Sequence, residues 1–205
     1  MVSGAAALAL YFFPRLLAGA SAWLIPAVLL YAPIGALIIT DRDFDGCGLR
    51  LPSRGAGRDV AGFALLVMPV FLAGFFAFAT LWLGREFHPR LPDWGSSVEL
   101  AVWQLLGVAL PEEVFFRGWL QGRLNLIFSS RVPILGARVG PGLFIAAGLF
   151  AAFHLLVLPA PSRLLVFFPG LLFGLFRERT NSVAVPVLTH ALANVLFLIA
   201  QGWVG

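Results

Sequence analysis

The chain has 205 residues, of which 60% are hydrophobic and only 12% are charged, and its formal net charge is +4. Soluble domains carry about 25% charged residues, so the composition excludes an ordinary soluble protein and indicates a polytopic membrane protein. All 14 basic residues are arginines spread along the chain, which argues against a nucleic-acid-binding stripe. We therefore expect a single integral membrane domain over residues 1–205, with the lipid bilayer as its surroundings.

Six apolar blocks predict an all-α, polytopic transmembrane helical bundle, since one crossing needs about 20 apolar residues. The blocks lie at residues 18–39, 60–84, 98–122, 141–158, 163–176 and 183–203. The fifth block is short and contains Pro169-Gly170, so it could be a broken or partial crossing. Residues 1–14 could add an interfacial element. The sequence thus predicts about six to seven membrane helices, with the active site inside the bundle.

The arginine distribution predicts the orientation of this bundle. With six crossings, the loops at 41–59, 123–140 and 177–182 share one side and hold nine arginines, whereas the opposite loops hold three. Arginine is enriched in cytoplasmic loops, so the first set is expected to be cytoplasmic. The absence of lysine and the richness in alanine and glycine suggest a GC-rich bacterial genome. We expect a multi-pass protein of the bacterial inner (plasma) membrane.

Charged residues inside an apolar helix mark the candidate functional site. Glu112, Glu113 and Arg117 lie in the third block, where an ionisable side chain costs at least about 2.5 to 3.5 kcal/mol. Such residues usually face a protein interior or a wet cavity. Glu113 and Arg117 are four residues apart with the acid first, the favourable order for a helical ion pair. Glu112 is then left free to act as a general base.

Three further polar residues lie at a similar depth. With a rise of 1.5 Å per residue, Glu112 and His154 lie about 15 and 20 Å from the cytoplasmic ends of their helices, and His190 and Asn194 about 11 and 17 Å. His190 and Asn194 are four residues apart and share a helix face. We therefore expect four polar side chains from three helices to converge on one level.

These residue types predict hydrolysis of an amide bond. A glutamate with a histidine can deprotonate water, and a second histidine with an asparagine can donate hydrogen bonds to the oxyanion. A zinc-dependent metalloprotease is an alternative, because one Glu and two His form a known zinc ligand set, although the HExxH motif is missing. A non-catalytic membrane scaffold or a transporter with a proton-relay glutamate is the other alternative. No cofactor is expected unless zinc is used.

Three short motifs together resemble the CPBP intramembrane proteases, which are CAAX-processing and bacteriocin-processing endopeptidases. The motifs are Glu112-Glu113-x-x-x-Arg117, Phe150-x-x-x-His154 and His190-x-x-x-Asn194. They occur in the family's order on separate apolar blocks, in a motif-bearing core of about residues 98–203. The resemblance implies a glutamate-dependent intramembrane endopeptidase with an all-helical core.

The resemblance also implies a role for each motif residue. Glu112 and His154 would activate water, and His190 and Asn194 would form the oxyanion hole. Glu113 and Arg117 would support the site and complete the candidate catalytic set. The substrate would be a membrane-anchored peptide or protein, and the bacterial composition favours a C-terminal sorting or anchoring segment over a prenylated C-terminus.

Overall fold

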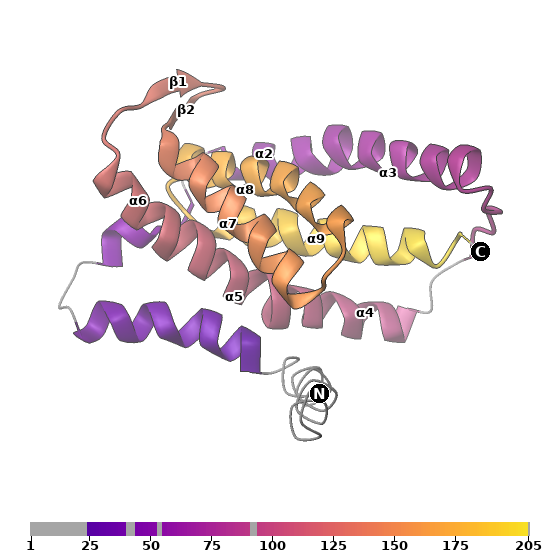
Figure 1. Ribbon diagram of the computed structural model, residues 1–205, viewed down its shortest axis with the longest axis horizontal. Helices are drawn as coiled ribbons and strands as arrows, with labels where there is room; N and C mark the ends of the chain where they lie inside the picture. The colour runs from indigo at the N-terminus through magenta and orange to yellow at the C-terminus, as the bar shows by residue number, and fades with distance from the viewer. Residues whose placement is uncertain (1–23, 40–43, 53–54, 91–93, 205) are drawn as a thin grey trace, which may run out of the picture.

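The computed structural model describes residues 24–39, 44–52, 55–90 and 94–204, and most of these are helical (Figure 1). Each of the six predicted apolar blocks corresponds to one helical segment. The segments are Leu24–Ile39, Ala56–Trp82, residues 94–127, Pro141–Val157, residues 161–180 and Ala184–Gln201. The possible seventh element at 1–14 lies outside the described residues, and the number of crossings stays a prediction.

The labelled elements divide these segments further. Two segments contain π-helical stretches, at Phe63–Val67, Phe78–Trp82, Trp103–Ala109 and Val114–Leu120. A 3-10 turn at Phe44–Cys47 follows the first segment, and another at Pro161–Val166 leads into α8. The α-helices are α2 (Ala56–Gly62), α3 (Met68–Ala77), α4 (Trp94–Val102), α5 (Leu110–Glu113), α6 (Gln121–Ile127), α7 (Pro141–Val157), α8 (Phe167–Thr180) and α9 (Ala184–Gln201).

Prolines account for two of the π-helical stretches. Pro69 and Pro111 have no N–H to donate, and their rings crowd the carbonyl four residues earlier. A π-helical stretch ends two residues before each of them, at Val67 and at Ala109. A wider turn accommodates the missing donor without ending the helix. As a result, α5, which carries the two adjacent glutamates, lies between two π-helical stretches of one continuous helix.

Close helix packing forms the interior. α7 packs against α6 and α8, and α9 packs against α8 and the stretch Trp103–Ala109. A Cβ added to Gly174 of α8 would lie 2.9 Å from Oε1 of Gln121 and 3.2 Å from Cγ of Leu143, so glycine lets α8 approach α6 and α7 without displacing these side chains. Phe63, Phe173 and Phe176 form an aromatic cluster that joins α8 to the segment Ala56–Trp82.

The outer surface is strongly apolar. Within the described residues, two helices are long and apolar enough to cross a membrane, Ala56–Trp82 and Ala184–Gln201. The first of them leaves large side chains such as Leu65, Leu66 and Leu81 exposed. Extended apolar surface of this kind suits lipid rather than water. The fold therefore agrees with a helical membrane protein.

Three details differ from the sequence prediction. The loop 123–140 contains an antiparallel β-hairpin, β1 (Val132–Ile134) and β2 (Ala137–Val139), so the fold is not purely α-helical. The expected break at Pro169-Gly170 is absent, because Pro169 lies in the first turn of α8, where proline is tolerated. α8 also continues to Thr180, which places Arg177 and Arg179 in a helix rather than a loop.

A buried polar cluster around Glu178 joins α6, α8 and the start of the hairpin. Oε1 of Glu178 accepts hydrogen bonds from Gln121 Nε2 and Asn125 Nδ2, both at 2.6 Å. Its Oε2 lies 3.5 Å from a guanidinium nitrogen of Arg131 and 3.8 Å from one of Arg177. The buried carboxylate thus has both hydrogen-bond donors and positive charges around it, as burial of a charge requires.

Candidate active site

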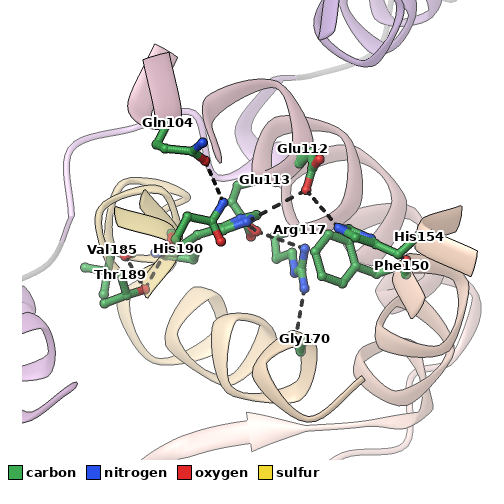
Figure 2. Close-up of polar contacts among 12 residues, drawn as sticks. Gln104, Glu112, Glu113, Arg117, Phe150, His154, Gly170, Val185, Thr189 and His190 are labelled. Atoms are coloured by element: carbon green, nitrogen blue, oxygen red, sulfur yellow. Dashed lines mark hydrogen bonds and ion pairs between the residues drawn. The ribbon is translucent and has the colours of Figure 1, made fainter. Parts of the chain in front are cut away.

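Three helical segments bring the predicted site residues together. Glu112, Glu113 and Arg117 come from the segment 94–127, His154 from α7, and His190 and Asn194 from α9. Figure 2 shows the side chains of Glu112, His154 and His190 directed toward one another. Oε2 of Glu112 lies 3.8 Å from Nε2 of His154 and 3.9 Å from Nε2 of His190. Three of the four side chains expected to converge therefore meet, whereas the hydrogen bond of Asn194 is to Gln104.

Glu113 forms the ion pair that its spacing from Arg117 predicts. The Arg117 guanidinium donates to Oε1 of Glu113 at 3.0 Å, and the two side chains are 1% and 0% exposed. The same oxygen accepts a hydrogen bond from Nδ1 of His190 at 2.8 Å. Arg117 also donates to the carbonyl of Gly170 at 3.2 Å and lies over the Phe150 ring, 4.0 Å from its centroid. One carboxylate therefore connects the segment 94–127 with α9, and Arg117 extends the connection to α8.

Glu112 has a different environment from its neighbour. Its side chain is 12% exposed and that of His154 is 20% exposed, so both retain some access. Its Oε2 is buried and has no hydrogen-bond partner among the described residues. Two atoms 3.8 Å apart can both contact one water molecule at about 2.8 Å. The distance between Glu112 and His154 therefore matches that spanned by a bridging water, although Oε2 of Glu112 itself is closed to solvent in this arrangement.

The hydrogen bonds define which nitrogen of each histidine faces Glu112. Nδ1 of His154 is 2.9 Å from the carbonyl oxygen of Phe150, which can only accept, so this nitrogen carries a hydrogen. Nδ1 of His190 likewise donates to the Glu113 carboxylate. In the neutral rings, both Nε2 atoms then present a lone pair toward Glu112. In each ring, Nδ1 is therefore hydrogen-bonded to a buried acceptor and Nε2 faces Glu112.

Asn194 has a partner that the sequence analysis missed. Its Nδ2 donates to Oε1 of Gln104 at 2.9 Å, and Gln104 is a buried residue of the π-helical stretch before α5. The signal available in the sequence was a polar side chain within the apolar block 98–122. The second amide hydrogen of Asn194 is left for another acceptor.

The donor arrangement does not fit tetrahedral zinc. Ligand atoms bound to tetrahedral zinc at 2.0 to 2.2 Å lie about 3.3 to 3.6 Å apart, whereas Glu112 Oε2 is 3.8 and 3.9 Å from the two histidine nitrogens. No group of three or more His, Cys, Asp or Glu within the described ranges is arranged to hold a metal ion. No chemical step is therefore derived through a metal.

A family model described as Type II CAAX prenyl endopeptidase Rce1-like matches residues 94–196, which is 103 of the 205 residues. The match covers the three motifs and Gln104. Searches of curated proteins and of solved structures give no match.

The buried pair of Glu113 and Arg117 provides a test of stability. Arg117→Met should lower the free energy of unfolding by about 3 to 5 kcal/mol, because it leaves a buried carboxylate without its cation. The double variant Glu113→Gln with Arg117→Met should recover most of this loss, because both charges are removed and the amide oxygen still accepts from His190. Denaturation in mixed micelles measures the free energy of unfolding of the single and the double variant. The control is Arg163→Met, the same change at an exposed position. Additive losses would contradict the coupling.

Proposed function

Because the chain belongs to the type II CAAX prenyl endopeptidase Rce1-like family, we propose that it is an intramembrane endopeptidase whose nucleophile is a water held by Glu112 and His154. The observation that carries the proposal is the partly exposed Glu112 carboxylate, whose Oε2 has no hydrogen-bond partner among the described residues and lies 3.8 Å from Nε2 of His154. Family membership favours a peptidase over the transporter or scaffold alternatives.

Glu112 is the group that moves the proton. As the water oxygen attacks the carbonyl carbon of the scissile peptide bond, Glu112 accepts the water proton and His154 orients the water through Nε2. The tetrahedral intermediate then collapses with cleavage of the C–N bond. The proton held by Glu112 passes to the leaving nitrogen, which restores the Glu112 carboxylate and releases an amine and a carboxylic acid; the acid then gives its proton to the amine or to solvent.

His190 and Asn194 are the donors for the oxyanion. Since Nδ1 of His190 donates to Glu113, its Nε2 can donate only when the ring carries a second proton. The Glu113 carboxylate still accepts from Nδ1 of that doubly protonated ring. The charges of Glu112, Glu113, Arg117 and a protonated His190 then sum to zero, which lowers the cost of burial. Asn194, oriented by Gln104, supplies the second hydrogen bond.

The substrate is a membrane-anchored protein cut near its C-terminus, and the apolar anchor would enter laterally from the bilayer. Quenched-fluorescent peptides in proteoliposomes test this directly. We expect cleavage of a peptide with an apolar transmembrane C-terminal tail. Cleavage of farnesylated CAAX peptides alone would contradict the choice of substrate while supporting the peptidase assignment.

Substitution of Glu112 tests the proposed base. Glu112→Gln keeps the size of the side chain but cannot accept the water proton, so kcat should fall at least about 100-fold. Cleavage of the tail peptide and the thermal midpoint in detergent are measured together, and the midpoint should stay unchanged. The control is Glu99→Gln, the same change at an exposed position of the same helical segment. Retained cleavage by Glu112→Gln would refute water activation by this residue.

Gln104 is a positioning residue that acts through Asn194. Asn194→Ala should lower kcat about 100- to 1,000-fold through loss of an oxyanion donor. Gln104→Leu should lower kcat about 10-fold, as for outer partners that orient a site residue, with little change in KM. In the Asn194→Ala background, Gln104→Leu should have no further effect on kcat. An undiminished effect in that background would show that Gln104 acts elsewhere.

Metal removal tests the water mechanism against the zinc alternative. The spacing of the donor atoms leads us to expect full cleavage after dialysis against 1,10-phenanthroline and EDTA, and less than stoichiometric zinc by elemental analysis. The control is a zinc peptidase treated in the same buffer. Loss of cleavage that returns on addition of zinc would establish the metalloprotease.

A further inference from the structure

The turn of the β-hairpin carries a residue that does not suit its backbone. β1 and β2 pair with Ile134 opposite Ala137, so Leu135 and Gly136 form a two-residue turn. Both have positive φ, 49° and 78°, as in a type I′ turn, for which Asn-Gly is the favoured sequence. A leucine rarely adopts such a conformation. Its side chain is 72% exposed, so packing within the protein does not explain its presence.

The hairpin has one apolar face, and only half of that face is covered. Val132, Ile134, Ala137 and Val139 all lie on it, because directly paired residues and alternate residues of a strand share a face. Ala137 and Val139 pack in a cluster with Leu143, Leu171 and Leu175. The outer strand leaves Val132 and Ile134 exposed, and Figure 1 shows the hairpin projecting beyond the ends of α6 and α7.

The charged residues near the hairpin in the sequence are all arginines, of which Arg131 is paired with Glu178 of α8. Residues 114–176 contain no aspartate or glutamate. Arg138 is exposed, and with Pro133 it occupies the face opposite the apolar one. A short element with an apolar side and arginine on the other suits the boundary between lipid headgroups and acyl chains. The loop belongs to the arginine-rich set that the sequence predicts to be cytoplasmic, and the cytoplasmic leaflet carries anionic lipids.

We propose that the hairpin, residues 131–139, is an interfacial anchor: Val132, Ile134 and Leu135 insert into the bilayer beside the helices, and Arg138 binds lipid phosphate. The anchor rests on the membrane placement that underlies the proposed function. It acts on the site through its connections. α6 precedes the hairpin in the segment that carries Glu112, α7 follows it and carries His154, and Arg131 pairs with Glu178 of α8. The anchor therefore sets the depth at which the site meets its substrate.

Labelling at single cysteines tests the location of the tip. Cys47, the sole native cysteine, is replaced by alanine, and an environment-sensitive fluorophore is attached at Leu135→Cys. In vesicles of phosphatidylcholine with phosphatidylglycerol, we expect quenching by spin-labelled lipid and protection from aqueous iodide. A label at Glu86→Cys, in an exposed loop position, should be quenched by iodide. Equal iodide quenching at 135 and 86 would overturn the proposal, and the tip would then face water, open to a soluble partner or the substrate.

Two variants separate lipid insertion from folding and charge. Leu135→Asn creates the favoured Asn-Gly turn, so the thermal midpoint in detergent should not fall, while a label at Val132→Cys should become several-fold more accessible to iodide in vesicles. A fall in the midpoint with unchanged accessibility would mean that Leu135 serves the fold. Arg138→Gln should abolish the difference in protection between vesicles with and without phosphatidylglycerol. If the parent protein shows no such difference, phosphate binding by Arg138 is refuted.

A label at Leu66→Cys separates the anchor from the membrane placement itself. Leu66 is an exposed apolar residue of the segment Ala56–Trp82, and its label should be quenched by spin-labelled lipid whether or not the hairpin inserts. Quenching at 66 without quenching at 135 would refute the anchor alone. Absence of quenching by spin-labelled lipid at both positions would refute the membrane placement. None of these readouts requires peptide cleavage, so the peptidase proposal is tested separately.

Discussion

The site depends on one buried carboxylate that accepts hydrogen bonds from two helical segments. Oε1 of Glu113 accepts one hydrogen bond from Arg117 of its own helix and one from His190 of α9. Without Arg117, the charge of Glu113 would be too costly to bury, and without Glu113 the His190 ring would lose the contact that sets its orientation. Arg117 in turn reaches the Gly170 carbonyl of α8. These hydrogen bonds join three helical segments through one carboxylate oxygen and one guanidinium, while Oε2 of Glu113 is buried without a hydrogen-bond partner among the described residues.

The aromatic surroundings add to this constraint. Phe150 lies against the Arg117 guanidinium and also contacts the rings of both histidines. The Phe173 ring stacks on His190, with 16° between the planes. Such rings pack closely around cations and imidazoles while excluding water from the deep side of the site. Among the described residues of the site, Glu112 and His154 are the more accessible side, since their side chains are partly exposed.

The sequence predicts the helices and the meeting of Glu112, His154 and His190 because both depend on local properties. Hydropathy identifies each apolar block, and the rise of 1.5 Å per residue gives the distance of each polar residue from the end of its helix. Gln104, the Glu178 cluster and the hairpin depend instead on contacts between distant segments. Gln104 gains its role only because α9 places Asn194 beside it. The sequence predicts a loop at Glu178 because the charges around it end the apolar block, whereas in α8 its carboxylate accepts hydrogen bonds from Gln121 and Asn125 of another helix. The hairpin forms at Leu135-Gly136, which lacks the usual turn sequence.

Two consecutive glutamates can have opposite roles because neighbouring helical residues point about 100° apart. Glu113 is turned into the protein, where Arg117 neutralises it, and Glu112 is turned toward the partly exposed His154 and the buried His190. If Glu112 also had a permanent cation, its basicity would be lost. If Glu113 were exposed, His190 would have no fixed acceptor. Pro111 and the π-helical stretches on both sides of α5 change the winding of the helix at this point, which fixes the direction of both side chains. One helical turn therefore supplies both Glu113, which holds Arg117 and His190 in place, and Glu112, the proposed general base.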